Sequence, residues 1–496
     1  MSHKSQLIKN TMIIAIGKIS TQIISYILLP LFTSKMAVNE YGIYDFICTV
    51  SIFLCPIITL LMEESMFRFL IDAKDEKEKK QVISQTIIYT VLGIIAFIPI
   101  AIIVLKYFSD YSNSLIIVFI IFVISNIAIG LSNALARGLS KIKLYSLSNF
   151  ILGLTTILLT FIMLLWKPNA ESLLWANTIA NLGTAFFIFI KLKLGKYIGK
   201  TNKTLMKKMV KYSIPLVPNS ISWSIINMSD RLFLTSLVNA EANGIYAMAS
   251  RFPNIINVVY SYFYTAWKET AAKIVKEKNK TDYYSSIYLD MKKIMFAVTI
   301  CLIAVMPFAF PIFIKDNYAE AYVYIPIIMI ATYYSCISSF YGGIFGAFKK
   351  TRIMGTTTII AATINLVVDL ALIKYIGIYA ACLSTLLADI IVYYYRKIKL
   401  KKYVRLNEIN PFGPASVLTL ICLAYYTKYM PFISDLWYWL LNILALLIAV
   451  LYSFFMNKTF LNDLLNKLKG RKSKVNWFTY GGCNNNGNYR KEQHSR

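Results

Sequence analysis

The sequence predicts an all-α membrane protein with about 14 transmembrane helices, arranged as two parallel six-helix repeats plus two extra C-terminal helices. Of its 496 residues, 57% are hydrophobic and only 15% are charged, whereas about a quarter of a typical soluble chain is charged. The apolar residues form runs of roughly 18–24, and roughly 20 helical residues cross the hydrocarbon core of a bilayer. Because such runs recur along the whole chain, we expect no sizeable soluble domain.

The apolar runs give the expected spans in order, separated by short polar connections. Two cytoplasmic connections differ from the rest. Segment 72–80 is a short mixed-charge run that suits a solvated loop or helix end, and segment 267–293 is long and amphipathic, which suits the membrane interface. The polar segment after Gly470 has the composition of a disordered tail. The expected spans cover residues 11–33, 43–62, 83–105, 115–135, 145–166, 172–190, 212–235, 244–266, 294–314, 323–346, 354–373, 377–395, 413–430 and 436–456.

The placement of the basic residues predicts the orientation of the spans. The chain has 52 Lys and Arg against 24 Asp and Glu, a net charge of +28. With both termini in the cytoplasm, the cytoplasmic segments hold 43 of the basic residues and the opposite connections hold six. Such an excess of Lys and Arg is typical of cytoplasmic loops. The net charge therefore needs no nucleic-acid partner, and we expect none, because no basic face interleaved with aromatic residues is present.

Motifs for catalysis, metal binding or cofactor binding are absent from the sequence. The seven cysteines are scattered singly, without C-x-x-C spacing or a metal-ligand pattern with His3 and His494. The chain contains no G-x-x-x-x-G-K-[ST] loop for nucleotide phosphates and no H-E-x-x-H motif. We therefore expect no enzyme, no resident metal and no cofactor.

Two pairs of similar segments indicate an internal duplication. FTSKMAVNEYGIYD (32–45) is similar to FLTSLVNAEANGIYA (233–247), and GLSKIKLYSLSN (138–149) is similar to GAFKKTRIMGTT (346–357). The offsets, about 202 and 209 residues, are close to each other. Six spans separate the members of each pair, so both copies have the same orientation, as in transporters built from parallel repeats with a site between the halves. The expected units are an N-terminal six-span bundle (1–200), a C-terminal six-span bundle (201–400), two appended spans (401–456) and a cytoplasmic tail (457–496).

Three basic residues, Lys18, Arg231 and Arg251, lie inside expected spans. Charges at this depth are costly and by default mark a pathway or a buried pair. Each belongs to a stripe of polar residues at helical spacing, and the first and seventh spans hold corresponding places in the two repeats. We expect these stripes to line a basic cleft between the halves. The candidate substrate-binding residues are Lys18, Gln22, Trp223, Asn227, Arg231, Arg251, Asn254 and Asn257.

The same charges also have structural interpretations. Lys18 can extend to the cytoplasmic surface, and Arg231 can pair with an acid such as Asp369 or Asp230 to fix the seventh span. The motif YYYR (393–396) suits an interfacial aromatic belt. Acids close to span ends suit caps or ion pairs, and these are Asp45, Asp369 and Asp389.

Several short motifs resemble those of the polysaccharide-repeat-unit (Wzx-type O-antigen) flippases. They are YGIYDF (41–46), SDRLFL (229–234), NGIYAMASR (243–251), Trp267 at the close of the eighth span, and Asn365 followed by YIGIYAACLSTLLAD. These flippases belong to the superfamily that also holds the multidrug and toxin extrusion (MATE) transporters and the lipid II flippases. The resemblance covers about residues 5–455. It departs at Lys268, where the family often has proline, and in the last 25 or so residues, which match no known pattern.

The resemblance implies a flippase that moves undecaprenyl-pyrophosphate-linked oligosaccharide units across the bacterial cytoplasmic (inner) membrane by alternating access, for surface polysaccharide biosynthesis. It implies as partners the lipid-linked oligosaccharide, membrane lipids, and the polysaccharide polymerase and glycosyltransferases of the same process. A cationic cleft suits a pyrophosphate, because the arginine fork matches phosphate oxygens.

Three other functions remain open at this point. A lipid II flippase is closely related and is poorly separated by sequence. A MATE-like drug or cation exporter needs an intramembrane carboxylate that faces the cleft. A membrane-embedded glycosyltransferase or polymerase usually carries a large loop outside the membrane, whereas the longest outer connection here has about nine residues.

The unequal distribution of basic residues makes the topology testable. Reporter fusions within 137–143, 191–211 and 396–405 should report the cytoplasm, and fusions at Asn39, Glu171 and Lys315 should report the outside. An outward reporter at Lys200 would contradict the assignment, because every later connection would then invert.

Overall fold

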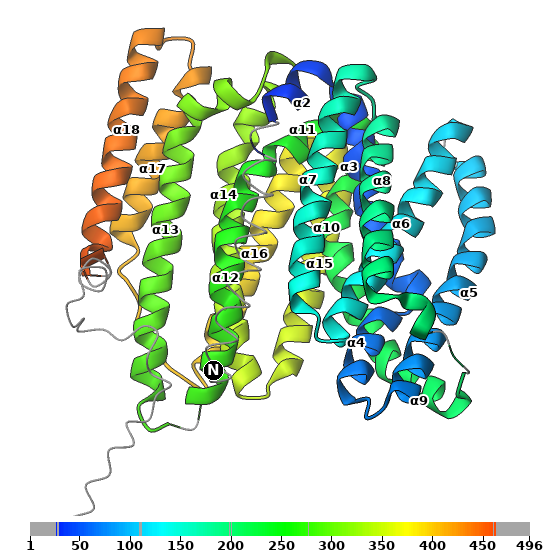
Figure 1. Ribbon diagram of the computed structural model, residues 1–496. Helices are drawn as coiled ribbons and strands as arrows, with labels where there is room; N and C mark the ends of the chain where they lie inside the picture. Colours follow the sequence, from blue (N-terminus) through cyan, green and yellow to red (C-terminus); the bar gives the residue numbers. More distant parts are fainter. Residues whose placement is uncertain are drawn as a thin grey trace, which may run out of the picture.

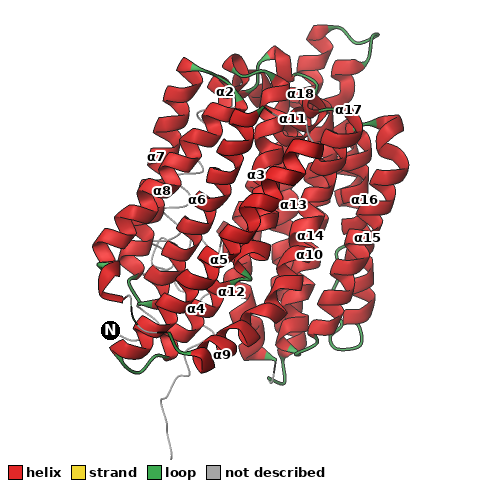
Figure 2. Ribbon diagram, turned by 90° about the vertical axis from the view of Figure 1, so that its right-hand side faces the viewer, coloured by secondary structure: helices red, strands yellow, loops and turns green. Residues whose placement is uncertain are grey.

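The computed structural model describes Tyr26 and residues 29–108, 112–197, 199, 201–275, 277–459 and 461–462. Within these residues every regular element is a helix, and the helices run side by side in one bundle (Figures 1 and 2). Ten helices of the described chain are long and apolar enough to cross a membrane. The protein is therefore an all-α, multi-pass membrane protein, as the composition predicts.

The first half of the chain forms the helices from α2 to α8, which occupy one side of the bundle (Figure 1). Most of the first expected span, with Lys18 and Gln22, lies outside the described residues. The spans expected from 43–62 to 172–190 each coincide with a helix. The helices are α2 (Leu29–Lys35), α3 (Val38–Thr59), α4 (Met62–Asp72), α5 (Glu76–Phe108), α6 (Asn113–Gly138), α7 (Ile142–Trp166) and α8 (Ala170–Leu192).

The second half begins at α9 and contains eight α-helices before the two appended ones. The expected seventh span is α10 together with a short π-helix (Leu234–Val238), and the eighth is divided between α11 and α12. The helices are α9 (Lys203–Ser213), α10 (Val217–Phe233), α11 (Ala240–Ala249), α12 (Arg251–Ile274), α13 (Lys280–Phe313), α14 (Ala321–Ala347), α15 (Thr351–Ile376), α16 (Ile378–Leu400), α17 (Phe412–Tyr426) and α18 (Asp435–Met456).

Asparagine caps fix where several of these helices begin. The side chains of Asn169, Asn202 and Asn239 each accept a hydrogen bond from a backbone N–H in the first turn of α8, α9 and α11. A side-chain oxygen at this position satisfies a donor that has no partner within the helix. The cap at Asn239 sets the start of α11, and α11 carries the second copy of the Gly-Ile-Tyr motif.

Two connections differ from the sequence-based expectation. The second span ends in a sharp bend at Leu60 and Leu61, both in the left-handed region with φ of 49° and 54°, after which α4 forms a separate helix. The segment 267–293 is not an interfacial connection. Instead α12 extends to Ile274 and α13 begins at Lys280, so most of this segment continues two long helices. The amphipathic pattern there reflects helix faces packed against neighbouring helices.

The appended helices α17 and α18 pack against α13 at the edge of the bundle farthest from α5 and α6 (Figure 1). The ring of Tyr425 stacks on that of Tyr322 in α14, with centroids 4.0 Å apart. The segment before α17 is held by Glu408, whose carboxylate accepts from Lys292 at 2.8 Å and lies 3.0 Å from the amine of Lys397. Burial alone raises the pKa of Glu408, but hydrogen bonds from the two lysines hold the pKa below its ordinary value.

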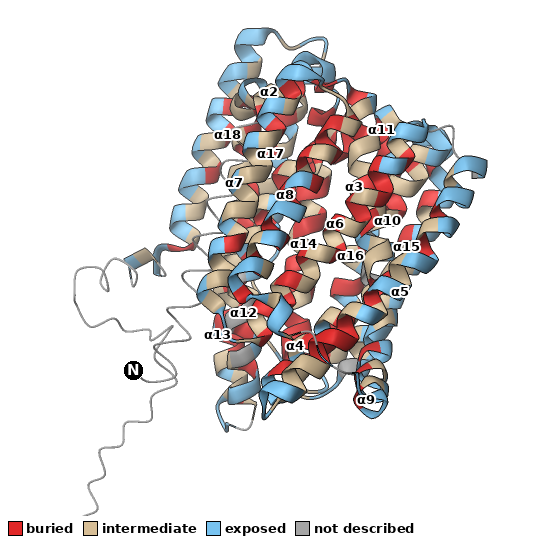
Figure 3. Cartoon of the chain, turned by 45° about the vertical axis from the view of Figure 1, so that its right-hand side comes forward, coloured by how far each residue is buried: buried red, intermediate tan, exposed pale blue. Residues whose placement is uncertain are grey.

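Burial separates the middle of the bundle from its lipid-facing surface. Figure 3 shows buried residues gathered on central helices such as α14, whereas α18 is mostly exposed or intermediate. Large apolar side chains on the outer faces are open, including Ile95 and Ile103 in α5 and Leu447 in α18. An exposed apolar belt of this kind suits contact with lipid tails.

The two halves of the chain meet where α3 crosses α11. Gly42 in α3 lies against the backbone carbonyl of Ala240, and Gly244 in α11 lies against that of Val38, so a Cβ at either glycine would collide with backbone. The contact is reciprocal. Gly42 and Gly244 are 202 residues apart, as are Val38 and Ala240, and this is the offset of the first pair of similar segments. Reciprocal contacts are typical of an interface with twofold symmetry. The side chain of Asn243 adds a hydrogen bond to the carbonyl oxygen of Gly42 at 2.7 Å.

The close approach at Gly244 predicts an unusual result for a glycine-to-alanine change. In a helix interior this change ordinarily stabilises, by up to about 1 kcal/mol. Gly244→Ala should instead lower the thermal unfolding midpoint of the purified protein, because the new Cβ forces α3 and α11 apart, and overpacking costs about 1–3 kcal/mol. Gly183→Ala in α8 is the matched control, since no atom lies within 4 Å of its Cβ position. Equal midpoints for the two variants would contradict the packing argument.

Candidate functional site

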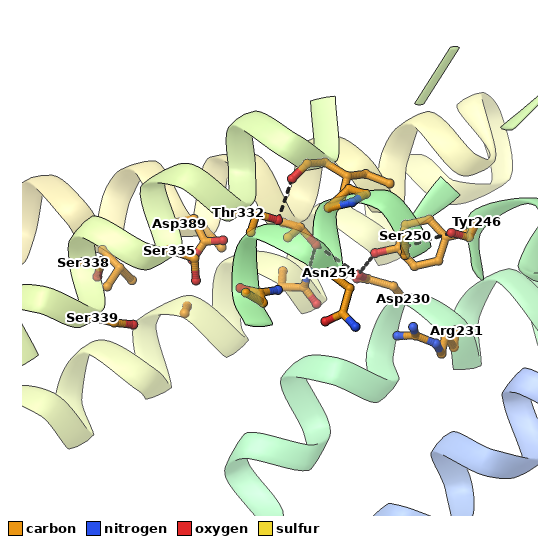
Figure 4. A pocket seen from close by; sticks show the side chains of 18 of the residues that line it. Asp230, Arg231, Tyr246, Ser250, Asn254, Thr332, Ser335, Ser338, Ser339 and Asp389 are labelled. Carbon is orange, nitrogen blue, oxygen red and sulfur yellow. Dashed lines mark hydrogen bonds between the residues drawn. The ribbon is translucent and has the colours of Figure 1, made fainter. Parts of the chain in front are cut away.

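A cavity of about 530 Å³ lies within the second half and is closed on one side by α3 of the first half. Its wall is rich in hydroxyl groups and contains three arginines and three aspartates. Figure 4 shows the labelled side chains in two groups, one with Asp230, Arg231 and Tyr246 and the other with Ser335, Ser338, Ser339 and Asp389. The charged lining residues are Asp45, Asp230, Asp389, Arg231, Arg251 and Arg396.

Four of the eight candidate residues from the sequence line this cavity, namely Arg231, Arg251, Asn254 and Asn257. Trp223 and Asn227 belong to α10, but their side chains are outside the described part of the structure, as are Lys18 and Gln22 entirely. The described wall is of mixed charge and not uniformly basic, since it contains as many aspartates as arginines. The sequence analysis assigned Asp45 and Asp389 to structural roles and so missed this balance.

Arg251 lies at the start of α12 and points toward α3. Its Nε and Nη2 atoms donate to the hydroxyl oxygen of Tyr41 at 2.8 and 2.6 Å. The backbone carbonyl of Arg251 accepts a hydrogen bond from Tyr26 at 2.8 Å. A guanidinium has five N–H donors, so three of them have no acceptor within the described chain. Arg251 is thus a cavity-lining cation, held in place by a neutral group and not by a carboxylate.

Arg231 forms an ion pair that joins the two halves. Its Nε donates to Oδ2 of Asp45 in α3 at 2.7 Å, and both side chains are about one-fifth exposed. The expected partners, Asp369 and Asp230, are not the acids in this ion pair. The interpretation of Arg231 as a structural pair is correct in kind, but the partner comes from the other half of the chain. The sequence does not indicate that Asp45 is the partner of Arg231, because 186 residues separate the two.

Two neighbouring carboxylates, those of Asp230 and Asp369, lie between α10, α15 and α16. Asp230 accepts hydrogen bonds from Tyr246 at 2.6 Å, Asn365 at 2.9 Å and Thr385 at 3.0 Å. Asp369 is fully buried, and neither of its oxygens accepts a hydrogen bond within the described chain. It lies beside the carboxylate of Asp230. Two adjacent buried carboxylates cannot both stay charged without compensation.

This arrangement suits one monovalent cation or one proton. The surrounding groups are hard oxygen donors, which suit hard cations such as Na⁺ rather than softer metals. Among the described residues no cluster of three or more His, Cys, Asp or Glu side chains could hold a metal ion. The pair supplies two carboxylates at most, so a single positive charge neutralises it in part. The sequence does not reveal this cluster, because its members come from different helices.

The corresponding region of the first half is polar but neutral. The side-chain amide of Asn181 donates to Ser125 at 3.2 Å and to Asn126 at 2.9 Å, and Asn126 donates to Ser51 at 2.8 Å. No carboxylate takes part in these hydrogen bonds. This polar cluster of the first half therefore differs in charge from the carboxylates at Asp230 and Asp369.

A second group of missed residues lies at the other end of the cavity. Arg396 is 9% exposed and faces inward, where its Nε and Nη2 donate to Thr357 at 2.9 and 2.7 Å. Tyr393 is buried against Tyr334 and Tyr341. The interpretation of YYYR as an interfacial belt is therefore wrong for these two residues, and of this motif Tyr394 is the exposed one that suits a belt. The helix turns the first and last residues of the motif inward.

A membrane bundle with a polar cavity beside the contact between two similar halves defines a transporter for a polar or amphiphilic solute. The model of the family described as "Polysaccharide biosynthesis protein" matches residues 7–267. The chain belongs to this polysaccharide biosynthesis family, which confirms the family resemblance seen in the sequence motifs.

Two curated relatives have low sequence identity to this chain. An uncharacterised membrane protein of Methanocaldococcus jannaschii is 23% identical over 311 residues, which cover 57% of this chain and 71% of the relative. Protein 1 of the Lsg locus of Haemophilus influenzae is 21% identical over 304 residues, covering 58% and 73%.

The fold is similar to those of several solved membrane transporters. The lipid II flippase MurJ in an inward closed conformation has a TM-score of 0.70 and 16% identity, covering 92% of this chain and all of that chain. An inward-facing multidrug resistance MATE family transporter has a TM-score of 0.59 and 14% identity, covering 78% and 98%. The proteins matched in fold are transporters and flippases, not enzymes.

The paired carboxylates predict cation-dependent stability. Replacing choline with Na⁺ at constant ionic strength should raise the thermal unfolding midpoint of the purified protein, because a cation bound to the native state at ten times its Kd adds about 1.4 kcal/mol. Asp369→Asn should remove most of this shift. Asp72→Asn, which changes a carboxylate exposed at the surface, should keep it. A wild-type midpoint that responds neither to Na⁺ nor to acidification would contradict the assignment.

Proposed function

We propose that this protein flips undecaprenyl-pyrophosphate-linked oligosaccharide units across the cytoplasmic membrane by alternating access, for surface polysaccharide biosynthesis. The observation that carries the proposal is Arg251, a cavity-lining guanidinium with no carboxylate partner in the described chain and with three N–H groups to offer. Arginine binds phosphate oxygens through two parallel hydrogen bonds. The membership of the polysaccharide biosynthesis family supports the same substrate class.

The rest of the cavity suits the sugar part of such a substrate. Its wall offers the hydroxyls of Ser250, Thr332 and Ser335 and the amides of Asn254 and Asn257. Its volume of about 530 Å³ falls in the range of about 300–1,000 Å³ that is common for small-molecule sites. The lipid tail can remain among the exposed apolar side chains of the outer faces, so only the polar headgroup needs a protein environment.

Alternating access requires the two halves to close on one side at a time. Here α11 of the second half packs on α3 of the first half at the end of the bundle where α2 lies, and α9 of the second half packs on α4 of the first half at the opposite end (Figure 1). We expect residues 1–200 to rock against 201–400 about the cavity, with both termini cytoplasmic. No nucleotide-binding motif is present, so we propose that a cation or proton at Asp230 and Asp369 drives the cycle.

Two alternative substrates belong to the same fold. MurJ is described as a lipid II flippase, and lipid II presents the same pyrophosphate chemistry. A MATE-like exporter of cationic drugs is the second alternative, and the three aspartates in the cavity wall favour it more than the sequence suggested. Changing Arg251 separates the drug exporter from the two flippases. Transport of a pyrophosphate-linked lipid should be lost, whereas transport of a cationic substrate should not, because a cation does not need an arginine.

Arg251→Ala should reduce surface glycan export at least tenfold in cells that depend on this protein, and Lys18→Ala should reduce it too. Arg251→Lys should restore only part of the export, because a point charge replaces a planar fork. Protein abundance in the membrane must be measured beside the surface glycan.

The control is Tyr41→Phe, which removes the hydroxyl that Arg251 binds but keeps the guanidinium. It should retain most of the export. If instead it matches Arg251→Ala, the arginine acts through this structural hydrogen bond. Normal export by Arg251→Ala and Lys18→Ala at normal protein abundance would contradict the proposed cationic site. The flippase function would then rest on family membership alone.

A further inference from the structure

Arg396 occupies the end of the cavity away from Arg251, in a setting built from three helices. It belongs to α16, and its guanidinium donates to the hydroxyl of Thr357 in α15 and, from Nη1, to the backbone carbonyl of Ser338 in α14 at 3.0 Å. These bonds fix the plane of the guanidinium. Three of its five N–H groups are used, and two have no acceptor within the described chain.

No carboxylate forms an ion pair with Arg396 among the described residues, although the side chain is 9% exposed. The nearest acid on its own helix is Asp389, seven residues earlier and therefore about 10 Å away along the axis. A buried arginine without an ion-pair partner is costly. Such a charge is expected where a ligand of opposite charge completes the site.

Two buried hydroxyl groups next to Arg396 also have no hydrogen-bond partner. The hydroxyl of Ser338 is unpaired and its residue is 2% exposed, and Ser338 lines the cavity. The hydroxyl of Tyr260 in α12 is likewise unpaired, in a residue that is 6% exposed and whose charge environment includes Arg396. Buried polar groups are normally satisfied. The spare N–H donors of Arg396 and the unpaired hydroxyls of Ser338 and Tyr260 suit a ligand with several acceptor oxygens.

The depth of Arg396 in the bundle differs from that of Arg251. Arg396 lies four residues before the end of α16, or about 6 Å from it, and the following segment is rich in lysine (397–402). Arg251 lies eleven residues after the start of α11, or about 16 Å from that helix end. Arg396 therefore lies closer to a helix end than Arg251 does, beside the lysine-rich segment.

We propose that Arg396, with the hydroxyls of Ser338 and Tyr260, forms a loading subsite for the phosphate groups of the diphosphate-linked lipid before they reach Arg251. This inference rests on the proposed function and adds to it a second binding position in the same cavity. Along α14 the lining residues run from Ile328 to Ser339, eleven residues and so about 16 Å. The headgroup moves along this polar wall between two arginines, neither of which forms an ion pair among the described residues.

A purely structural role for Arg396 is the main rival, since the residue joins α14, α15 and α16. Thr357 and the carbonyl of Ser338 explain how the guanidinium is held. They do not explain why the hydroxyls of Ser338 and Tyr260 stay unpaired beside it. The two roles differ in their effect on ligand affinity at unchanged stability.

The test measures equilibrium binding of radiolabelled farnesyl diphosphate to the full-length chain in detergent, together with the thermal midpoint without ligand. Arg396→Ala should weaken binding at least tenfold, and Arg396→Lys should weaken it less while keeping the wild-type midpoint. Arg352→Ala is the matched control, since it removes an exposed arginine that does not line the cavity, and it should bind as wild type. If Arg396→Ala does not fold, the Lys variant decides the question.

Competition distinguishes the possible sources of the phosphate. Unlabelled farnesyl diphosphate should displace the probe from the wild type better than inorganic pyrophosphate or phosphatidylglycerol does. Equal displacement by phosphatidylglycerol would make this an ordinary lipid contact and overturn the proposal. Wild-type affinity in the folded Arg396 variants, with loss only in Arg251→Ala, would overturn the loading subsite alone. Failure of the wild type to bind the probe would overturn the proposed function and the subsite with it.

Discussion

The close packing of α3 on α11 determines how the two halves of this protein face each other. Gly42 and Gly244 allow backbone to touch backbone at this crossing, and the contact repeats itself with the period of the duplication. Two arginines of the second half contact the first half, and both bind residues of α3. Tyr41 and Asp45 flank Gly42 in α3, and they bind Arg251 and Arg231. A bulkier side chain at either glycine would move the partners of both arginines together.

The charged groups are concentrated on the second half and on α3, and α10 has a central position among them. Its adjacent residues Asp230 and Arg231 point to different partners. Asp230 is bound by groups of α11, α15 and α16, whereas Arg231 pairs with Asp45 of the first half. Within the proposed function, neutralising the carboxylate cluster changes the electrostatic balance one residue away from the ion pair that joins the halves. Such a shared element is a physical route for coupling between a cation and a conformation.

The cavity wall combines arginines and aspartates. Arginines suit a phosphate-bearing lipid, and aspartates suit a cation. In this chain most of the aspartates are engaged by protein groups: Asp45 by Arg231 and Asp230 by three donors. Arg251 and Arg396 are held by hydroxyl and carbonyl oxygens and keep N–H groups to spare. Although the wall holds equal numbers of both charges, the donors left over for a ligand come mainly from the arginines.

The sequence by itself determined the class of fold and the positions of most spans, because a bilayer demands apolar helices of a set length and basic loops on one side. It also placed Arg231 and Arg251 at a polar face, since helical spacing is local. Only the tertiary structure decided that Arg231 pairs with Asp45, that Asp369 lies beside Asp230, and that Arg396 turns inward from an aromatic-rich helix end. These contacts join residues from different helices, and helix-to-helix packing, which no local pattern records, sets which side chains meet.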